Sequence, residues 1–342
     1  MRAVTFDPDT DRFSLREIAP PAPGPGEVRV RVAACGLNPV DAKLPSWKAM
    51  ALGMTADWVA GLDVSGRIDA LGPGVEHWRV GDAVLYHGDM LSPHGGLAEL
   101  AIHPAATLLA HPRLPPVIAA SLPCSGWVAW RALVDKLRLA PGDSLLVLGG
   151  SGGVGGFAVQ LARLLGARPI IAVCSRAHHA FVLSHGATHA IDYRSEDVAR
   201  RVCEITGGYG VTRAIDAVGW DADLAAVECL AFEGELVELV DLARPHHYRD
   251  AFGRGLSFHQ LALGAAHRHG EAARRRLLEV GREVCGLAEA GVVRATVARE
   301  LELADVPAAL HGLLGERLVG KTVAILSPNA LDSSDRASAN ST

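Results

Sequence analysis

The sequence has few cysteines, and they are scattered. They lie at positions 35, 124, 174, 203, 229 and 285, and no two of them form a C-x-x-C pair. This spacing fits neither a disulfide framework nor a zinc ribbon. The chain also begins without a recognisable signal peptide, so we expect free thiols and a cytoplasmic protein.

An excess of charge of one sign is missing as well. Thirty-three lysines and arginines face 38 aspartates and glutamates, which leaves a net charge of −5. A general nucleic-acid binder would present a basic face, so we expect no nucleic-acid partner. The one basic run, at 274–276, lies among glutamates in a predicted helix and indicates a solvated helix face.

A membrane-spanning helix is not expected. The uncharged stretch 144–162 is long enough to be considered, but it contains six glycines. Such a composition favours a strand, a turn and a helix over a helix that crosses a bilayer.

The length of 342 residues favours two domains, and the pattern of apolar residues, glycine and proline changes along the chain in agreement with this. Residues 1–122 contain short β-rich runs divided by glycine and proline. Residues 123–265 alternate apolar strands with helical patterns, which predicts an α/β domain with a doubly wound parallel sheet. Residues 266–327 contain a long amphipathic helix at 271–290 and further strands, and 328–342 form a polar tail that we expect to be disordered.

A glycine-rich turn follows the apolar run "SLLVL". The motif G-x-G-x-x-G is matched by Gly150, Ser151, Gly152, Gly153, Val154 and Gly155, and the helical pattern "FAVQLARLLG" follows it. Glycines there permit a tight turn and a close approach of the backbone to a diphosphate, which the helix N-terminus attracts. The sequence therefore predicts a dinucleotide-binding Rossmann unit.

The residues at the end of the next predicted strand indicate which dinucleotide is bound. NAD sites usually place an acidic residue there to hold the ribose 2′-hydroxyl. This chain has Cys174, Ser175 and Arg176 instead. A hydroxyl and a guanidinium suit a 2′-phosphate, so the prediction is NADPH.

Segments along most of the chain resemble the medium-chain dehydrogenase/reductase superfamily, and within it the zinc-independent quinone oxidoreductase branch. They are "AACGLNPVDAK" at 33–43, "GLDVSGRIDALGPGV" at 61–75, "RVGDAVL" at 79–85, "HGGLAELAIHP" at 94–104, "LPCSGWVAWRAL" at 122–133, "LGGSGGVGGFAVQLA" at 148–162, "DAVG" at 216–219 and "VGKTVAIL" at 319–326. The resemblance implies a GroES-like catalytic domain built from both ends of the chain. It also implies a Rossmann domain between them and an active site in the cleft.

The resemblance also bears on metal binding. Zinc alcohol dehydrogenases of this superfamily carry a cysteine where this chain has Asn38, and a histidine where it has Leu62. A catalytic zinc needs about three protein ligands. With two of the expected ligands absent, we expect no metal.

Three residues of the "NPVDAK" segment are candidate catalytic groups. The amide of Asn38 could donate a hydrogen bond to the substrate oxygen on which negative charge develops. Lys43 stands where similar enzymes often have a tyrosine. It could hydrogen-bond the substrate oxygen or relay a proton, or it could instead lie on the domain surface or touch the cofactor ribose. Asp41 could orient Lys43 or cap a turn.

Other residues receive weaker assignments from the same resemblance. Tyr193 matches a position near the adenosine phosphate of similar NADPH enzymes, with strand-end packing as the alternative. Val128 replaces a threonine that can touch the nicotinamide region. Trp47 and Trp58 could form an apolar cleft wall or belong to the domain core. The "DAVG" segment adds cofactor-binding candidates: Ala217, Val218 and Gly219.

The resemblance implies an NADPH-dependent quinone or enone reductase acting on a small molecule. Two alternatives stay open: a zinc alcohol dehydrogenase, and a cofactor-binding protein with little turnover, of a crystallin-like or regulatory kind. We also expect a homodimer, since the apolar segment 255–264 could supply an unpaired edge strand.

Overall fold

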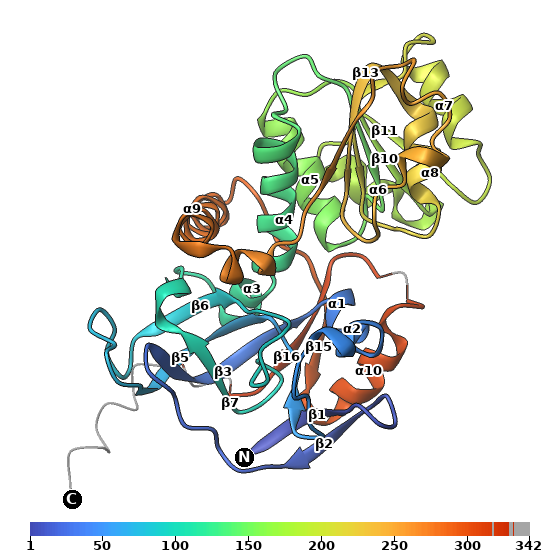
Figure 1. Ribbon diagram of the computed structural model, residues 1–342. Coiled ribbons are helices and arrows are strands. Elements are labelled where there is room, and N and C mark those ends of the chain that lie inside the picture. The colour runs from blue at the N-terminus through green and yellow to red at the C-terminus, as the bar shows by residue number, and fades with distance from the viewer. Residues whose placement is uncertain (317, 328–330, 332–342) are drawn as a thin grey trace, which may run out of the picture.

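The computed structural model describes residues 1–316, 318–327 and 331. The chain forms two lobes (Figure 1), with the blue N-terminal and red C-terminal elements together in one and the green-to-orange middle of the chain in the other. The tail expected at 328–342 lies outside the described residues, apart from Leu331.

The first lobe, which we call the barrel half, is built on two sheets. One has the strand order β15-β16-β3-β5-β6-β8, with β7 also paired to β3, and the other has the order β2-β1-β4. Their bounds are β1 Arg2–Asp7, β2 Arg12–Glu17, β3 Glu27–Leu37, β4 Trp58–Val59, β5 Asp63–Leu71, β6 Ala83–His87, β7 Leu100–Pro104, β8 Leu109–Ala110, β15 Val297–Glu302 and β16 Lys321–Ile325. The helices of this half are α1 Pro39–Ala42, α2 Leu44–Trp47, α3 Pro116–Ala120 and α10 Val306–Leu313.

Strand β3 shows how sequence pattern sets the architecture of this half. Val28, Val30 and Val32 are buried, while Arg29 and Arg31 point outward, so one face meets the core and the other meets solvent. From residue 33 to the end of β3 at residue 37 every position is buried, because α3 covers the outer face of this part of the strand. A Cβ on Gly36 would lie 2.4 Å from the Ala120 carbonyl oxygen, so this close approach requires glycine.

The second lobe, the nucleotide half, is a six-stranded sheet in the order β11-β10-β9-β12-β13-β14, and every neighbouring pair is parallel. The strands are β9 Leu145–Leu148, β10 Ile170–Cys174, β11 His189–Asp192, β12 Val211–Asp216, β13 Leu230–Glu238 and β14 Ser257–Gln260. The helices of this half are α4 Val128–Trp130, α5 Gly153–Leu164, α6 His179–His185, α7 Val198–Ile205 and α8 Ala222–Cys229, while α9 Gly270–Glu289 lies at its junction with the barrel half. The parallel α/β sheet predicted from the alternating pattern is confirmed.

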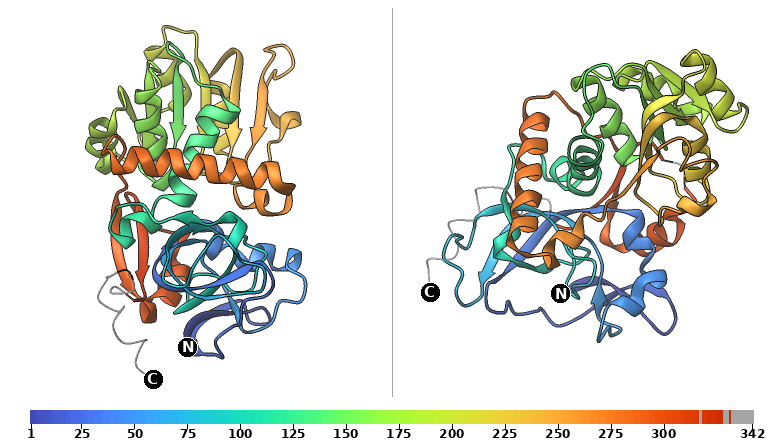
Figure 2. Two further views of the ribbon diagram at one scale, coloured as in Figure 1. Left: turned by 90° about the vertical axis from the view of Figure 1, so that its left-hand side faces the viewer. Right: turned by 45° about the horizontal axis from the view of Figure 1, so that its top comes forward.

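The long helix α9 lies between the two lobes (Figure 2, left). Its buried residues Leu277, Val280 and Val284 share one core with Trp127 and with strand residues of the nucleotide sheet. Within the segment 266–327, therefore, α9 fills the junction, and β15, α10 and β16 return to the barrel half. Across the described residues, no helix is both long and apolar enough to cross a membrane.

Candidate active site

The glycine turn lies where β9 ends and α5 begins. Gly149 adopts φ +76°, and a Cβ on Gly155 would lie 2.2 Å from the Gly149 carbonyl oxygen, so neither position tolerates a side chain without strain. Helix α5 starts at Gly153 and directs its free N–H groups toward the turn. This bare cradle fits the diphosphate of a dinucleotide.

A cavity of about 650 Å³ opens beside the turn, within the size range of ligand sites. It brings together many of the residues expected from the sequence. The predicted residues that line it are Lys43, Ser151, Gly152, Ser175, Tyr193, Ala217, Val218 and Gly219.

The remaining predicted cofactor residues lie elsewhere. Gly153, Val154 and Gly155 line a smaller adjoining cavity of about 190 Å³, and Gly150 lies beneath the turn against Ala172. Arg176 is exposed on the turn after β10 and is not among the lining residues of the described chain.

His178 lines the larger cavity, although sequence reasoning did not select it. Its Nδ1 lies 3.0 Å from the Ser151 hydroxyl, which ties the residue to the glycine turn. The pattern "SRAHHA" gave no signal to choose His178 over Arg176, because the turn after β10 decides which side chain faces inward.

Lys43 reaches the cavity from the barrel half. Its Nζ lies 5.2 Å from the centre of the Trp220 ring, at a distance typical of a cation–π contact between the two halves. Both residues line the cavity. Lys43 therefore contacts the nucleotide half, and Asp41 does not orient it in this structure.

Asp41 instead ties the barrel half together. Its fully buried carboxyl accepts hydrogen bonds from the backbone N–H groups of Asn38 (2.8 Å) and Gly61 (3.1 Å). Burial, and then the charge of Asp63, raise the pKa of Asp41 to about 6. Of the two roles expected from the sequence, the geometry gives it the capping one.

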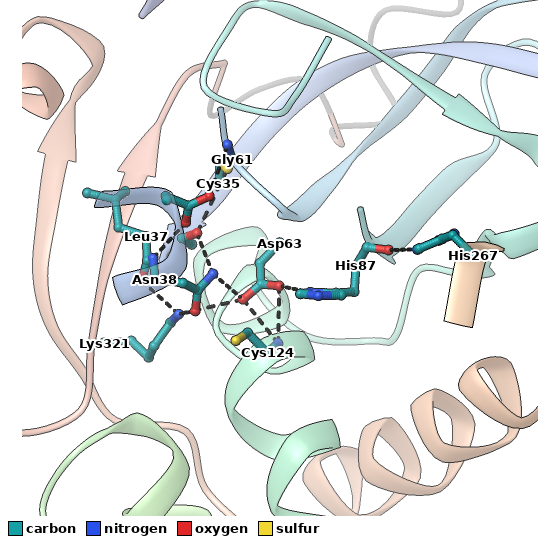
Figure 3. A network of polar contacts seen from close by, with 11 residues as sticks. Cys35, Leu37, Asn38, Gly61, Asp63, His87, Cys124, His267 and Lys321 are labelled. Atoms are coloured by element: carbon teal, nitrogen blue, oxygen red, sulfur yellow. Dashed lines mark hydrogen bonds and ion pairs between the residues drawn. The ribbon is translucent and has the colours of Figure 1, made fainter. Parts of the chain in front are cut away.

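Asn38 is fully engaged within the protein (Figure 3). Its Nδ2 donates to Asp63 Oδ2 at 3.0 Å and to the Gly36 carbonyl at 3.3 Å, and its Oδ1 accepts from the Lys321 ammonium. Neither amide hydrogen is left to donate to a substrate. The structure therefore departs from the expected direct role and makes Asn38 a positioning residue.

Asp63 is the centre of this network (Figure 3). Its buried carboxylate accepts from His87 Nδ1 at 2.7 Å and from the Cys124 backbone N–H at 3.1 Å, and Lys321 Nζ lies 3.5 Å away. Burial alone would raise the pKa of Asp63, but the His87 hydrogen bond and the Lys321 charge together hold it below the usual value. Asp63 is thus an ionised carboxylate with most of its acceptor capacity used.

A zinc ion does not fit this arrangement. The oxygens of Asp63 already accept from several donors, and a lysine ammonium lies where a second cation would be repelled. In the described chain, no cluster of three histidine, cysteine or carboxylate side chains could hold a metal ion.

Sequence reasoning missed Lys321, His87 and Cys124 as members of the site. Lys321 lines the same small cavity as Asn38, Cys124 and Gly152, and its Nζ also donates to the Leu37 carbonyl at 2.8 Å. The sequence did contain one signal for Lys321. It is the first residue of the apolar strand "KTVAI", where a buried charge without a partner would be destabilising.

Two buried carboxyls lie beneath the loops of the cofactor cavity. Asp216 and Glu238 end β12 and β13 and are direct partners in the sheet register. Asp216 Oδ1 accepts from the N–H groups of Val218 and Gly219, and Glu238 Oε1 accepts from those of Val240 and Asp241. Burial, and then the charge of Asp216, raise the pKa of Glu238 to about 7, although the backbone donors oppose this rise.

Comparison with known proteins bears on this site. The family model "Alcohol dehydrogenase GroES-like domain" matches residues 24–113, and "Zinc-binding dehydrogenase" matches residues 153–245. A quinone oxidoreductase of Pseudomonas aeruginosa is 32% identical over 319 residues, covering 91% of this chain and 94% of its own. A 2-haloacrylate reductase of Burkholderia is 30% identical over 324 residues, covering 92% and 95%.

Solved structures agree with these sequence matches. A quinone oxidoreductase of Pseudomonas syringae superposes with a TM-score of 0.83 at 27% identity, covering 95% of this chain and 99% of its own. An alcohol dehydrogenase superfamily protein from Novosphingobium aromaticivorans gives the same values. The combination of a GroES-like half and a Rossmann-like half, expected from the sequence, is confirmed.

The carboxyl pair predicts a pH-dependent stability. Because the pKa of Glu238 is higher in the folded protein than its usual value of 4.5, the folded state binds the extra proton between pH 4.5 and 7. The free energy of unfolding should therefore fall as pH rises through this range and level off above it. Glu238→Gln should make this decline smaller, by up to about 3 kcal/mol between pH 5 and pH 8, while the raised pKa values of Asp41 and Asp216 keep part of it.

The measurement is urea-induced unfolding of both proteins at pH 5 and pH 8. Glu300→Gln, an exposed substitution in β15, is the matched control and should leave the pH dependence unchanged. The same pH dependence in the wild type and in Glu238→Gln would contradict the assignment.

Proposed function

The chain belongs to the medium-chain dehydrogenase/reductase superfamily, in its quinone oxidoreductase-like branch, and on this premise we propose that it reduces a quinone or an α,β-unsaturated carbonyl compound with NADPH. The observation that carries the proposal is the glycine turn beside a cavity formed between both halves of the chain. The resemblance of the chain to a quinone oxidoreductase and to a 2-haloacrylate reductase supports the substrate class.

A bound nicotinamide cofactor would supply the hydride. In this chain, the backbone of the glycine turn would hold the diphosphate, and Ser175, His178 and Tyr193, which line the same cavity, would hold the adenosine part. No carboxylate ends β10, where NAD enzymes usually have one to hold the ribose 2′-hydroxyl, so this strand end offers NAD no acidic partner. Ala217, Val218 and Gly219 border the same cavity from the end of β12.

Negative charge that develops on the substrate oxygen must also be stabilised. We assign this role to the charge of the buried Lys321 ammonium, which lines the small cavity beside the glycine turn and is held in place by Leu37, Asn38 and Asp63. Lys43, at the rim of the larger cavity, remains our candidate for delivering the proton.

The cofactor preference is testable. NADPH should bind more tightly than NADH. Both His178→Ala and Arg176→Ala should weaken the binding of NADPH and leave the binding of NADH nearly unchanged. A hydrogen bond to a charged group contributes roughly 1.5–3 kcal/mol, which corresponds to about ten- to a hundredfold in affinity. Because Arg176 is exposed, the loss of NADPH affinity in Arg176→Ala should lie at or below the lower end of this range.

Calorimetric titration of both cofactors would measure this, with the exposed Arg200→Ala as control. If His178→Ala and Arg176→Ala both bind NADPH like the wild type, the phosphate contact lies with Ser175 or Tyr193. A wild-type preference for NADH would contradict the NADPH assignment itself.

The zinc-free assignment is a second prediction. Purified protein should carry far less than one zinc per chain, because Asn38, Leu62 and the Lys321 ammonium leave no ligand set around Asp63. Elemental analysis measures the metal, and activity before and after dialysis against a chelator measures its need. Stoichiometric zinc with chelator-sensitive turnover would instead favour the zinc alcohol dehydrogenase alternative.

We also propose a cytoplasmic homodimer. The six cysteines are all unpaired, as a reducing compartment requires. Strand β14, inside the segment expected to pair, is an edge strand of the nucleotide sheet and could join that of a second copy. Sedimentation at micromolar concentration should give twice the mass of the chain. Phe258→Pro, in the strand expected to pair, should shift the protein toward monomer. A wild-type monomer would exclude this pairing.

A further inference from the structure

Two buried carboxyls form a pair beneath the cofactor cavity. Asp216 is the last residue of β12 and Glu238 is the last residue of β13, and the two are direct partners in the register of these parallel strands. Asp216 has no exposed surface, and Glu238 is only 2% exposed. Neither carboxyl takes part in the proposed reaction, although the burial of two adjacent carboxyls is destabilising by itself.

Each carboxyl uses one oxygen to hold the loop that follows its strand. The backbone donors are residues 218 and 219 for Asp216 Oδ1, and residues 240 and 241 for Glu238 Oε1, at distances of 2.8 to 3.1 Å. The pair therefore anchors two loops to the sheet, 217–221 after β12 and 239–241 after β13.

The second oxygen of each carboxyl depends on the other carboxyl. Asp216 Oδ2 and Glu238 Oε2 are buried, and no N–H or O–H group among the described residues donates to either of them. The two carboxyls instead hydrogen-bond each other. Such a bond requires a proton on one of them, because two carboxylates offer only acceptors. The pair is thus satisfied only while it shares one proton.

The charged groups around the pair do not replace this proton. Burial, and beyond it the charge of Asp223 in α8, raise the pKa of Asp216. Arg244, the cation that contacts Asp223, is also engaged by Asp221 at 2.7 Å, and the Tyr248 hydroxyl donates to Asp223 at 2.9 Å. The register partners of the pair on the flanking strands are uncharged: Leu148 of β9 and Gln260 of β14.

The two anchored loops form one wall of the cofactor cavity, which Val218, Gly219 and Val240 line. The loops also touch each other, since a Cβ on Gly219 would lie 2.6 Å from Asp241 Oδ2 and 2.7 Å from the Val240 side chain. Val218 lies against the turn that would hold the diphosphate, because a Cβ on Gly149 would lie 3.0 Å from its side chain. A movement of either loop therefore changes the shape of the cavity.

Trp220 extends this arrangement to the other half of the chain. Its backbone adopts φ +47°, a left-handed conformation that is unfavourable for a residue with a large side chain, and its N–H donates to Asp241 Oδ2 at 3.0 Å. Its ring lies 5.2 Å from the Lys43 ammonium. Such a conformation persists only while its surroundings hold it, and Asp241 is itself anchored by Glu238.

Loss of the shared proton would leave two adjacent negative charges in a buried place. Two carboxylates that share a site repel each other, and relief requires either separation or the entry of water. Both responses move the ends of β12 and β13 and the loops that they anchor. The anionic diphosphate of a bound dinucleotide would make the second negative charge still less favourable.

We propose that Asp216 and Glu238 are positioning residues that share one proton, and that this proton holds the two loops in the shape that binds the dinucleotide. Binding then takes up a proton, which passes from a buffer acid to the carboxyl pair, and no bond of the cofactor changes. The affinity for the dinucleotide falls as pH rises above neutral. This inference rests on one part of the proposed function, namely that a nicotinamide dinucleotide fills the cavity.

Calorimetric titration of NADPH at pH 6.5 and pH 8.5 tests the link. Burial, and then the charge of Asp216, raise the pKa of Glu238 to about 7, so the free wild type loses the proton between these two pH values. Its affinity should fall roughly threefold to thirtyfold, within the limit of about tenfold per pH unit that one proton sets. Glu238→Gln, whose amide donates to Asp216 at every pH, should keep its affinity at pH 8.5. The titration of the cofactor's own phosphate is common to both proteins and cancels in the comparison.

Three further variants separate the proton from the shape of the site. Asp216→Asn should also flatten the pH dependence, because its amide donates to Glu238. Glu238→Ala removes the acceptor for the loop after β13, so it should weaken NADPH binding roughly threefold to tenfold even at pH 6.5, whereas Glu238→Gln should not. Glu228→Gln, at an exposed position in α8, is the matched control and should behave like the wild type.

The proton itself is counted from the heat of binding. At pH 7.5 the titration is carried out in phosphate and in Tris, whose heats of ionisation differ, and the difference gives the number of protons taken up. The wild type should take up a larger fraction of a proton per NADPH than Glu238→Gln. Equal proton uptake, or the same pH dependence of affinity in the wild type and both amide variants, would overturn the inference.

Hydrogen exchange of the free protein tests the loops without any cofactor. At pH 8.5 the amides of 217–221 and 239–241 should exchange faster in the wild type than in Glu238→Gln, and at pH 6.5 the two proteins should agree. Equal exchange at pH 8.5 would also overturn the inference. If affinity and exchange depend on the proton but the wild type reduces no quinone or enone, the proposed reaction fails and this inference stands. If neither NADPH nor NADH binds at either pH, both fail.

Discussion

The buried charge of Asp63 is the constraint on which the candidate site depends. A carboxylate removed from water is strongly destabilising unless donors surround it, and here the donors come from β6, from the residue before α1, from the turn before α4 and from β16. Each of these elements is thereby held at the cleft. The same charge fixes the Asn38 amide and the Lys321 ammonium, so the electrostatics of the site and the packing of the barrel half have one origin.

Lys321 also links this network to the cofactor side. Gly320, the residue before it, donates its N–H to the Ser151 carbonyl of the glycine turn at 3.1 Å, and a Cβ on Gly153 would lie 3.1 Å from the Lys321 side chain. The strand that closes the barrel half therefore lies against the turn that would hold a diphosphate. The Lys321 charge therefore lies next to the turn that would hold the diphosphate.

The cofactor cavity is built where the two halves of the chain meet. It is bordered by strand ends of a parallel sheet, where loops and a helix N-terminus present backbone donors. This arrangement is suited to the phosphates of a dinucleotide.

The sequence by itself determined the order of the elements, because glycine, proline and apolar periodicity act over a few residues. The strand at 257–260, the helix at 270–289 and the glycine turn at 149–155 all lie where these patterns predicted them. Only the tertiary structure decided which polar residues form the site. Lys321 and Asn38 are 283 positions apart, and nothing local reveals that they meet. Asn38 looked like a substrate donor until its neighbours were known, since the direction of an amide depends on long-range hydrogen bonds. The same holds for His178 and Arg176, whose inward or outward orientation follows from the path of one turn against the rest of the fold.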